Sequence, residues 1–286
     1  MQICTSKSEL RAALAPIHHA NQTLGLVPTM GYLHDGHMEL VRQACAQNDH
    51  VAASIFVNPT QFGSVEDLDK YPRSMERDLD LLRDAGVSVV FTPTPEDMYH
   101  PEPQTIVETT NLAGRLMGEL RPGHFRGVAT VVTKLFNLFQ PTRGYFGEKD
   151  YQQLAVIRTM VRDLDIPLEI VGVPTVREAD GLAMSSRNAR LSPEARTAAT
   201  VLFQSFAKAE ELLARGHTVE DVRAALWAMI EAEPLALVKS VDIQDAETLA
   251  DISGHPSRDV VVLLAVEFAP VLLIDQHVIP IKKETP

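Results

Sequence analysis

Two histidines in the segment PTMGYLHDGH (residues 28–37) are the first side chains whose type and spacing suit chemistry. His34 and His37 lie on either side of an Asp-Gly pair, after a short apolar run. Imidazoles at this spacing can bind a metal, exchange protons or hold an anion. The loop carries Gly31 and Gly36 and leads into a helix predicted to start near His37, whose N–H groups and dipole attract negative charge. The segment therefore predicts a triphosphate site, although no Walker A lysine motif is present.

Other interpretations of the histidine pair stay open at the level of sequence. The rings can equally cap a helix or lie in the core, and a zinc site lacks a third ligand at typical spacing nearby. The cysteines, Cys4 and Cys45, are far apart and fit no ligand spacing. Both are expected to be reduced thiols, with Cys45 on the apolar side of a helix.

Three more polar segments contain residues that suit a small polar or anionic ligand. Lys149 stands near a predicted helix start, where a cation is unfavourable for the helix, which indicates an anion partner. The ordinary alternative is a solvated lysine. Gln153 follows one helical turn later, and its amide can both donate and accept. The segments are NPTQF (58–62), GEKDYQQ (147–153) and READGLAMSSRN (177–188).

The net charge of −12 argues against nucleic acid and anionic lipid as partners, because such a surface repels them. The basic segment RPGHFRG (121–127), with Arg121, His124 and Arg126, suits a small anion better than a long polyanion. No apolar run approaches the ~20 residues that span a bilayer. The start, MQICTSKSEL, lacks the basic flank and apolar core of a signal peptide. A cytoplasmic location is expected.

Apolar segments alternate with helical periodicity through the first part of the chain, which predicts an α/β fold with a parallel sheet covered on both faces. Because ligands bind at the carboxyl ends of such strands, the four polar segments are expected to share one edge of the sheet. The predicted strands are 24–29, 51–58, 87–93, 143–147 and 168–176. The predicted helices are 7–20, 37–46, one that ends before Gly86, 127–140 and 150–165.

The pattern changes after about residue 180, so a domain boundary is expected near residues 176–186. Two helices with a polar face and then three β-rich stretches indicate an α+β domain. The helices are predicted at 193–215 and 218–231, and the β-rich stretches are VKSVDIQD, DVVVLLAVEF and PVLLIDQHVI.

Taken together, the motifs closely resemble those of the pantothenate synthetase (pantoate–β-alanine ligase) family, within the HxGH nucleotidyltransferase superfamily. The matching stretches are PTMGYLHDGH, FVNPTQF, YPR, RPGHFRGV, GEKDYQQ and DGLAMSSRN, in that order over residues 28–188. The resemblance implies a Rossmann-like catalytic domain over 1–176 that binds ATP and pantoate, and an α+β lid domain over 177–286. It also implies ATP as a substrate, Mg²⁺ and a homodimer.

The resemblance implies a two-step reaction: ATP and pantoate form pantoyl-adenylate and pyrophosphate, and β-alanine then displaces AMP to give pantothenate. It makes His34, His37 and Lys149 the catalytic residues and assigns pantoate to Gln61 and Gln153, with Gln61 also meeting β-alanine. The ATP residues by this resemblance are Met30, Gly31, Tyr32, Leu33, His34, Asp35, Gly36, His37, Gly147, Glu148, Lys149, Asp150, Val176, Met184, Ser185, Ser186 and Arg187.

Two positions depart from the family pattern, and two rival functions remain. Tyr32 stands where a small residue is usual, and Asp35 where glutamate is expected. One rival is an adenylyltransferase that joins ATP to a phosphorylated substrate, which does not need Gln61 and Gln153 together. The other is a nucleotide-sensing module without catalysis, which binds ATP and releases no pyrophosphate.

Overall fold

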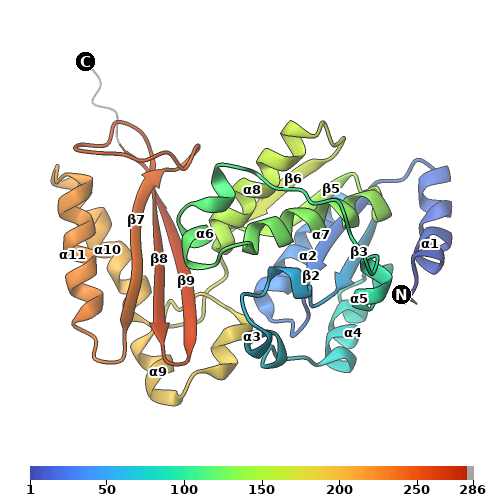
Figure 1. The fold of residues 1–286 in the computed structure, drawn as a ribbon, viewed down its shortest axis with the longest axis horizontal. Coiled ribbons are helices and arrows are strands. Elements are labelled where there is room, and N and C mark those ends of the chain that lie inside the picture. The colour runs from blue at the N-terminus through green and yellow to red at the C-terminus, as the bar shows by residue number, and fades with distance from the viewer. Residues whose placement is uncertain (282–286) are drawn as a thin grey trace. The chain divides into compact units, whose positions relative to one another are not determined.

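The protein, described here by a computed structural model over residues 1–281, divides into two compact units (Figure 1). Unit 1 comprises Met1–Glu148 and Val156–Pro174. Unit 2 comprises Lys149–Ala155 and the chain from Thr175 onward. The segment that begins with Lys149 therefore belongs with the second unit, which the sequence pattern did not predict. The expected division into a catalytic domain and a lid domain stays a prediction.

A six-stranded parallel sheet forms the centre of unit 1, with the order β1-β4-β3-β2-β5-β6, and confirms the predicted α/β class. Strand β1 escaped prediction because three residues at a sheet edge carry no periodic signal. Several predicted strands extend past the paired residues. The strands are β1 (Gln2–Cys4), β2 (Leu24–Thr29), β3 (His50–Ile55), β4 (Val89–Phe91), β5 (Arg143–Gly147) and β6 (Glu169–Val173).

Helices cover both faces of this sheet. Helices α2 and α4 contribute Leu40 and Leu82 to a core cluster on one face, and on the other face Phe139 of α7 packs edge-on against Phe91. The helices of the first part of the chain are α1 (Lys7–His19), α2 (Asp35–Gln47), α3 (Val65–Asp69), α4 (Met75–Asp84), α5 (Pro95–Met98), α6 (Met117–Leu120), α7 (His124–Phe139) and α8 (Tyr151–Asp163), with 3₁₀ turns η1 (Pro59–Gln61), η2 (Leu112–Gly114) and η3 (Glu148–Asp150).

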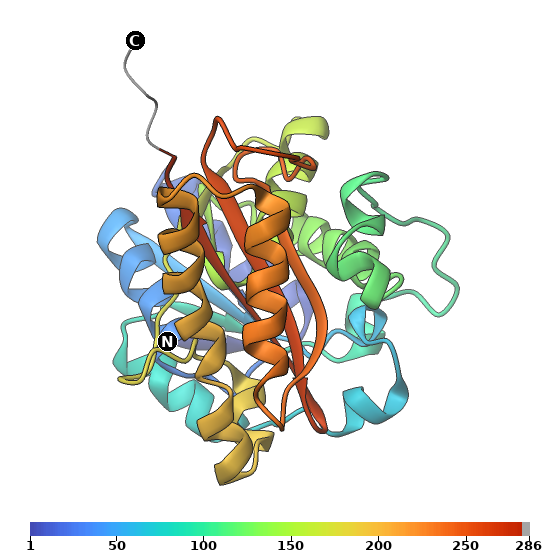
Figure 2. The same cartoon turned by 90° about the vertical axis from the view of Figure 1, so that its left-hand side faces the viewer.

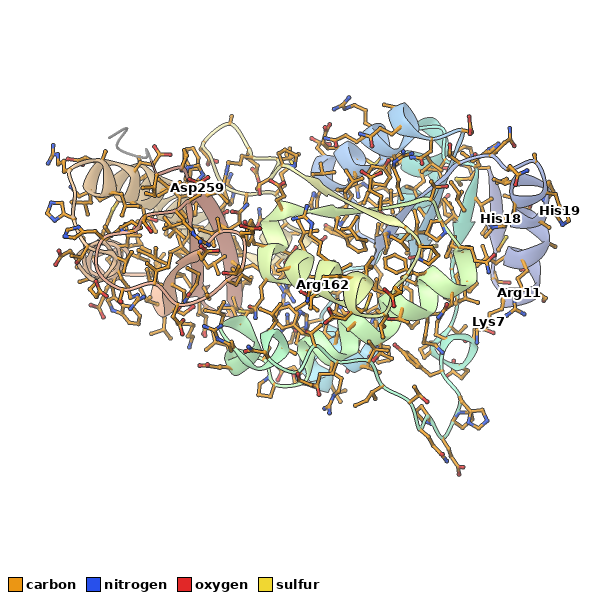
Figure 3. The ribbon with its side chains drawn as sticks, turned by 90° about the horizontal axis from the view of Figure 1, so that it is seen from above. Lys7, Arg11, His18, His19, Arg162 and Asp259 are labelled. Carbon is orange, nitrogen blue, oxygen red and sulfur yellow. The ribbon has the colours of Figure 1, made fainter. Side chains whose placement is uncertain are left out.

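Basic residues line helix α1, which packs beside the edge strand β1 (Figure 3). On this helix, Figure 3 labels Lys7, Arg11, His18 and His19. Strands β4 and β3 separate β1 from β2, the strand that leads into the histidine loop. These side chains therefore lie at the far edge of the sheet from that loop.

Unit 2 has its own antiparallel sheet, β7-β8-β9, with α10 and α11 side by side over one face (Figure 2). The predicted helix 193–215 is wrong as one piece, because the Thr200 hydroxyl donates to the Thr197 carbonyl at 2.8 Å and competes with the helical bond. The elements are η4 (Ser186–Arg190), α9 (Pro193–Ala198), α10 (Val201–Ala214), α11 (Val219–Glu231), β7 (Leu237–Asp245), β8 (Val260–Phe268) and β9 (Val271–Ile279).

The two cysteines differ in environment. Cys4 is buried, whereas Cys45 is exposed, so its expected place on the apolar side of the helix is wrong. Helix α2 buries Leu40, Val41 and Ala44, and Cys45 is turned about 100° away from Ala44 around the axis. Within residues 1–281, no helix is long and apolar enough to cross a membrane.

Candidate functional site

The four polar segments follow four adjacent strands, in the order β3-β2-β5-β6. All these strands are parallel, so their carboxyl ends lie at one edge of the sheet. The chain proceeds from β2 to β3 in one direction and from β5 to β6 in the other, which makes β2/β5 a topological switch point. Open α/β sheets bind ligands at such a point. The predicted shared edge is therefore confirmed for the strand ends.

The HDGH loop, defined here as residues 30–37, ends in an unusual cap made by two histidines. Helix α2 begins at Asp35, two residues before the predicted start, with His34 as its N-cap. Nδ1 of His34 accepts the Gly36 N–H at 3.1 Å, and Nδ1 of His37 accepts the His34 N–H at 3.3 Å. The helix starts earlier than predicted because an imidazole nitrogen can replace the usual hydroxyl or carboxylate of a cap.

This capping box fixes which nitrogen of each ring accepts a backbone N–H group. A neutral imidazole that accepts at Nδ1 carries its proton at Nε2. The two rings lie 4.1 Å apart between centroids and are tilted by 51°. Capping and anion binding, which were alternatives at the level of sequence, are thus compatible, because the cap uses Nδ1 and Nε2–H can serve as a donor.

Asp78 of α4 holds the HDGH loop from behind and is the main residue that sequence reasoning missed. Its carboxylate is 1% exposed and accepts the N–H groups of Tyr32 and Leu33 at 2.6 and 2.8 Å. Leu33 and Asp78 are 45 residues apart, and the helical pattern of 75–84 gives Asp78 no distinguishing mark. A buried acidic residue in an otherwise polar helix segment is visible only once the fold is known.

Gln61 lies at the end of η1 and joins the loops that follow β2 and β3. Its Nε2 donates to the Met30 sulfur at 3.2 Å, so these two predicted site residues are in contact. Its Oε1 accepts from Asn58 Nδ2 at 2.9 Å, and Asn58 in turn accepts from the Tyr99 hydroxyl at 2.7 Å. Burial raises the pKa of Tyr99, which keeps this hydroxyl protonated and able to donate. The Gln61 side chain is therefore held with Oε1 turned inward.

The basic segment before α7 binds the backbone of the same residue. The carbonyl oxygen of Gln61 lies 2.8 Å from Nδ1 of His124 and accepts from Arg121 at 3.2 Å. Gly127 allows this approach, because a Cβ there would lie 2.5 Å from the Thr60 carbonyl oxygen. Arg121 and His124 thus position Gln61. The sequence had indicated only that this basic segment suits a small anion.

In unit 2, Lys149 and the MSSRN loop, defined as residues 184–188, are brought together. Lys149, Ser185 and Asn188 line one small depression. The Lys149 side chain is 16% exposed and its Nζ lies 3.9 Å from Asp150, so the alternative of a solvated surface lysine is wrong. Asp150 is a negative partner of Lys149 and Asp275 lines the same depression, so part of the charge of Lys149 is already offset within unit 2. Gln153 is half-buried and lies in the same unit.

The MSSRN loop follows a hairpin that is fastened by arginines. Arg177 donates to Asp275 of β9 at 2.7 and 3.0 Å, and its guanidinium stacks over Phe203 at 4.9 Å. The Met184 N–H donates to the Val176 carbonyl at 3.0 Å, which ties the loop to the predicted nucleotide residue before the hairpin. Ser185 caps η4 by accepting the Arg187 N–H.

The predicted site residues therefore form two groups. Met30, His34, His37 and Gln61 lie around the ends of β2 and β3 in unit 1, and Lys149, Gln153, Val176 and the MSSRN loop lie in unit 2. Contact between Gln61 and Gln153 on one substrate stays a prediction.

A parallel sheet with a switch point and a histidine-capped helix start defines a doubly wound α/β protein, a class whose members bind ligands at the carboxyl edge of the sheet. The sequence profile of the pantoate-beta-alanine ligase family matches residues 2–278, and the chain belongs to that family.

Relatives and solved structures agree over nearly the whole chain. A pantothenate synthetase of Sinorhizobium medicae is 52% identical over 98% of this chain and 96% of its own length. The crystal structure of a pantothenate synthetase from Thermus thermophilus has a TM-score of 0.91 at 47% identity, and covers 97% of this chain and 99% of its own. A pantoate-beta-alanine ligase from Francisella tularensis, described as complexed with β,γ-ATP and β-alanine, has a TM-score of 0.79 at 32% identity and covers 97% of both chains.

Proposed function

We propose that this protein catalyses the ATP-dependent condensation of (R)-pantoate with β-alanine to pantothenate, through a pantoyl-adenylate intermediate that releases pyrophosphate and then AMP. The observation that carries the proposal is the histidine-capped helix start at the switch point of a chain that belongs to this ligase family. The structure of the Francisella relative is described as a complex with β,γ-ATP and β-alanine, which supports ATP and β-alanine as the ligands that the proposal requires.

The HDGH loop and the MSSRN loop would bind the nucleotide. Nε2–H of His34 and His37 would donate to the phosphates, as their use of Nδ1 in the cap supports. The partly buried cation of Lys149 would offset negative charge that grows on the phosphates in the transition state. Val176 and the backbone of residues 147–150 would complete the ATP site, with Ser185, Ser186 and Arg187 at the phosphates.

Gln61 and Gln153 would hold pantoate so that its carboxylate faces the α-phosphorus. Oε1 of Gln61 accepts from Asn58 and one Nε2–H donates to the Met30 sulfur, which supports the second Nε2–H as the group offered to an oxygen of the substrate. Both reactants are anions and the carboxylate is a weak nucleophile, so the protein must contribute position and positive charge rather than a covalent intermediate. The loop 60–72 and unit 2 are candidates to shield the adenylate from water.

Mg²⁺ would enter with ATP, bound chiefly by the phosphates. In the described part of the chain, no group of three or more His, Cys, Asp or Glu side chains is arranged to hold a metal. Mg²⁺ commonly keeps several waters and relies on substrate phosphates, so such a donor set is not required. We assign no step to a metal held by the protein alone. A cytoplasmic homodimer is the expected state, and light scattering of the purified protein tests the dimer.

The decisive experiment follows the oxygen atoms of pantoate. In-line attack at the α-phosphorus leaves one carboxylate oxygen on AMP after β-alanine displaces it. Pantoate labelled with heavy oxygen in its carboxylate should therefore give labelled AMP and unlabelled pyrophosphate. Label in inorganic phosphate, with ADP as co-product, would indicate an acyl-phosphate route and refute the proposal. Pyrophosphate release that depends on a mononucleotide substrate would indicate a dinucleotide-forming enzyme, and ATP binding without pyrophosphate release would indicate a sensor.

A further inference from the structure

The carboxylate of Asp78 serves two consecutive backbone groups of the HDGH loop. One oxygen accepts the Tyr32 N–H at 2.6 Å and the other accepts the Leu33 N–H at 2.8 Å. The side chain is 1% exposed, so the charge lies away from water and depends on these donors. Both N–H groups therefore point toward α4.

The backbone at this point needs such support. Gly31 has φ +83° and Tyr32 has φ +53°, so two successive residues adopt the left-handed region. A tyrosine there is unfavourable because its Cβ crowds the following carbonyl, and the conformation persists only when neighbouring contacts impose it. The bonds to Asp78 are contacts of that kind. Tyr32 is also one of the two positions at which the sequence is expected to depart from the family pattern.

Arg77 completes the arrangement from the exposed side. Its guanidinium donates to the Leu33 carbonyl at 2.8 Å and lies 5.9 Å from the centroid of the Tyr32 ring. It is also 3.8 Å from Asp78, so it partly neutralises a carboxylate that lies directly beneath a loop assigned to phosphates. Without this cation the buried charge would repel an anionic ligand.

We infer that Arg77 and Asp78 form a clamp that sets the shape and the local charge of the HDGH loop for ATP. Both are positioning residues, since each acts through the loop backbone rather than on the nucleotide. The inference rests on the proposed function, because it takes ATP as the ligand of the loop. It extends that function by linking the first turns of α4 to nucleotide affinity.

Steady-state kinetics of Asp78→Asn provide the first test. An amide keeps the shape of the side chain but can accept only one of the two N–H groups and loses the charge. The KM for ATP should rise about tenfold, as expected when a charge-assisted hydrogen bond is lost, while the KM for pantoate stays unchanged. A folded variant with the wild-type KM for ATP, or with both KM values raised equally, would overturn the clamp.

Arg77→Met tests the other half and does not depend on a buried substitution. The matched control is Arg83→Met, on the same helix, where the exposed arginine pairs with the exposed Asp80. Arg77→Met should raise the KM for ATP several-fold and Arg83→Met should not. In Asp78→Asn the same arginine substitution should have a smaller effect, because no buried charge remains to be neutralised. Equal behaviour of the two arginine variants refutes the inference, and decides it even if Asp78→Asn does not fold.

Calorimetry with a non-hydrolysable ATP analogue separates this inference from the proposed function. If the wild type binds the analogue but makes no pantothenate, the proposed function fails and the dissociation constants of the variants still test the clamp. If the wild type makes pantothenate and the Asp78 and Arg77 variants bind the analogue normally, the clamp fails and the function stands.

Discussion

The two loops assigned to ATP are held in place by opposite means. Behind the HDGH loop a buried carboxylate, Asp78, accepts backbone N–H groups. Beside the MSSRN loop, arginines fasten the preceding hairpin: Arg177 binds Asp275, and Arg196 binds Asp180 at 2.8 Å. The first support is sealed from solvent, whereas part of the second is exposed and therefore open to salt and acid. The comparison teaches that a support buried from solvent and a support that is partly exposed should respond differently to salt and acid.

The largest effect is expected where the second support is itself buried. Arg177→Met leaves the Asp275 carboxylate, 1% exposed, without its cation, and breaking such a pair costs roughly 3–5 kcal/mol. The free energy of unfolding of unit 2 should fall by that amount. Trp227 in α11 is the only tryptophan of the chain, so its fluorescence during denaturation reports this unit alone.

Two further variants show whether the loss comes from the uncompensated charge. Arg215→Met, at an exposed ion pair with Glu211, is the control and should leave the transition nearly unchanged. Adding Asp275→Leu to Arg177→Met should recover part of the stability, since apolar replacement of both partners removes the buried charge. If Arg177→Met lowers the free energy of unfolding by less than about 1 kcal/mol, Arg177 contributes no more than an exposed ion pair does. The predicted difference between the buried and the exposed pairs would then be wrong.

Among the predicted site residues of unit 1, His37 should have the largest effect on catalysis. Removing a donor that stabilises transition-state charge typically costs about 10²–10³ in rate, so His37→Ala should lose adenylate formation to that extent. His37→Gln retains a group that can reach back to the His34 N–H, as glutamine does in a capping box, but lacks the imidazole.

If both His37 variants lose activity while melting normally, the ring acts in chemistry rather than in capping. Activity restored by glutamine would assign His37 to the cap alone. His19→Ala, an exposed histidine in α1, controls for the loss of an imidazole elsewhere. Single-turnover measurement of pantoyl-adenylate separates this step from the attack by β-alanine.

In unit 2, Lys149 should have an intermediate effect on the affinity for ATP. Loss of a charge-assisted hydrogen bond to phosphate costs ~1.5–3 kcal/mol, or roughly 10–100-fold in ATP affinity. Lys149→Ala should weaken binding of an ATP analogue by that factor and leave the melting temperature almost unchanged. Lys208→Ala, a half-exposed lysine of the same unit paired with Glu211, is the matched control. Lost stability with intact affinity would mean that the buried lysine is structural.

What the sequence could predict depended on whether the signal was local. Strand β2 and helix α1 were predicted almost to the residue, because apolar runs and helical periodicity lie within one segment. His34, Gln61 and Lys149 were found because glycines, strand ends and a misplaced cation mark them. Asp78, Asn58 and Arg177 act across long separations in the chain, and no pattern in their own segments reveals what they hold. The same limit explains why α9 and α10 were merged: a single hydroxyl, that of Thr200, breaks the helix.

The smallest effect is expected at the exposed part of the second support, and it depends on pH. The hydrogen bonds from Arg196 hold the pKa of Asp180 below its usual value of about 3.9. A carboxyl whose pKa is lowered by folding stabilises the folded state above the unfolded pKa, and this contribution disappears as the pH falls through the lower folded pKa. Asp180 is about half exposed, so the contribution is at most ~1 kcal/mol.

Asp180→Asn keeps the bond to the Leu182 N–H but not the charge. Unit 2 of the wild type, followed by Trp227 fluorescence, should therefore exceed the variant in stability at pH 6. The difference should shrink progressively as the pH falls below about 4, and 1 M salt should reduce it. A stability difference that persists in acid would assign the effect to the shape of the turn rather than to its charge. The hairpin before the MSSRN loop would then be as insensitive to pH as is expected for the loop that Asp78 supports.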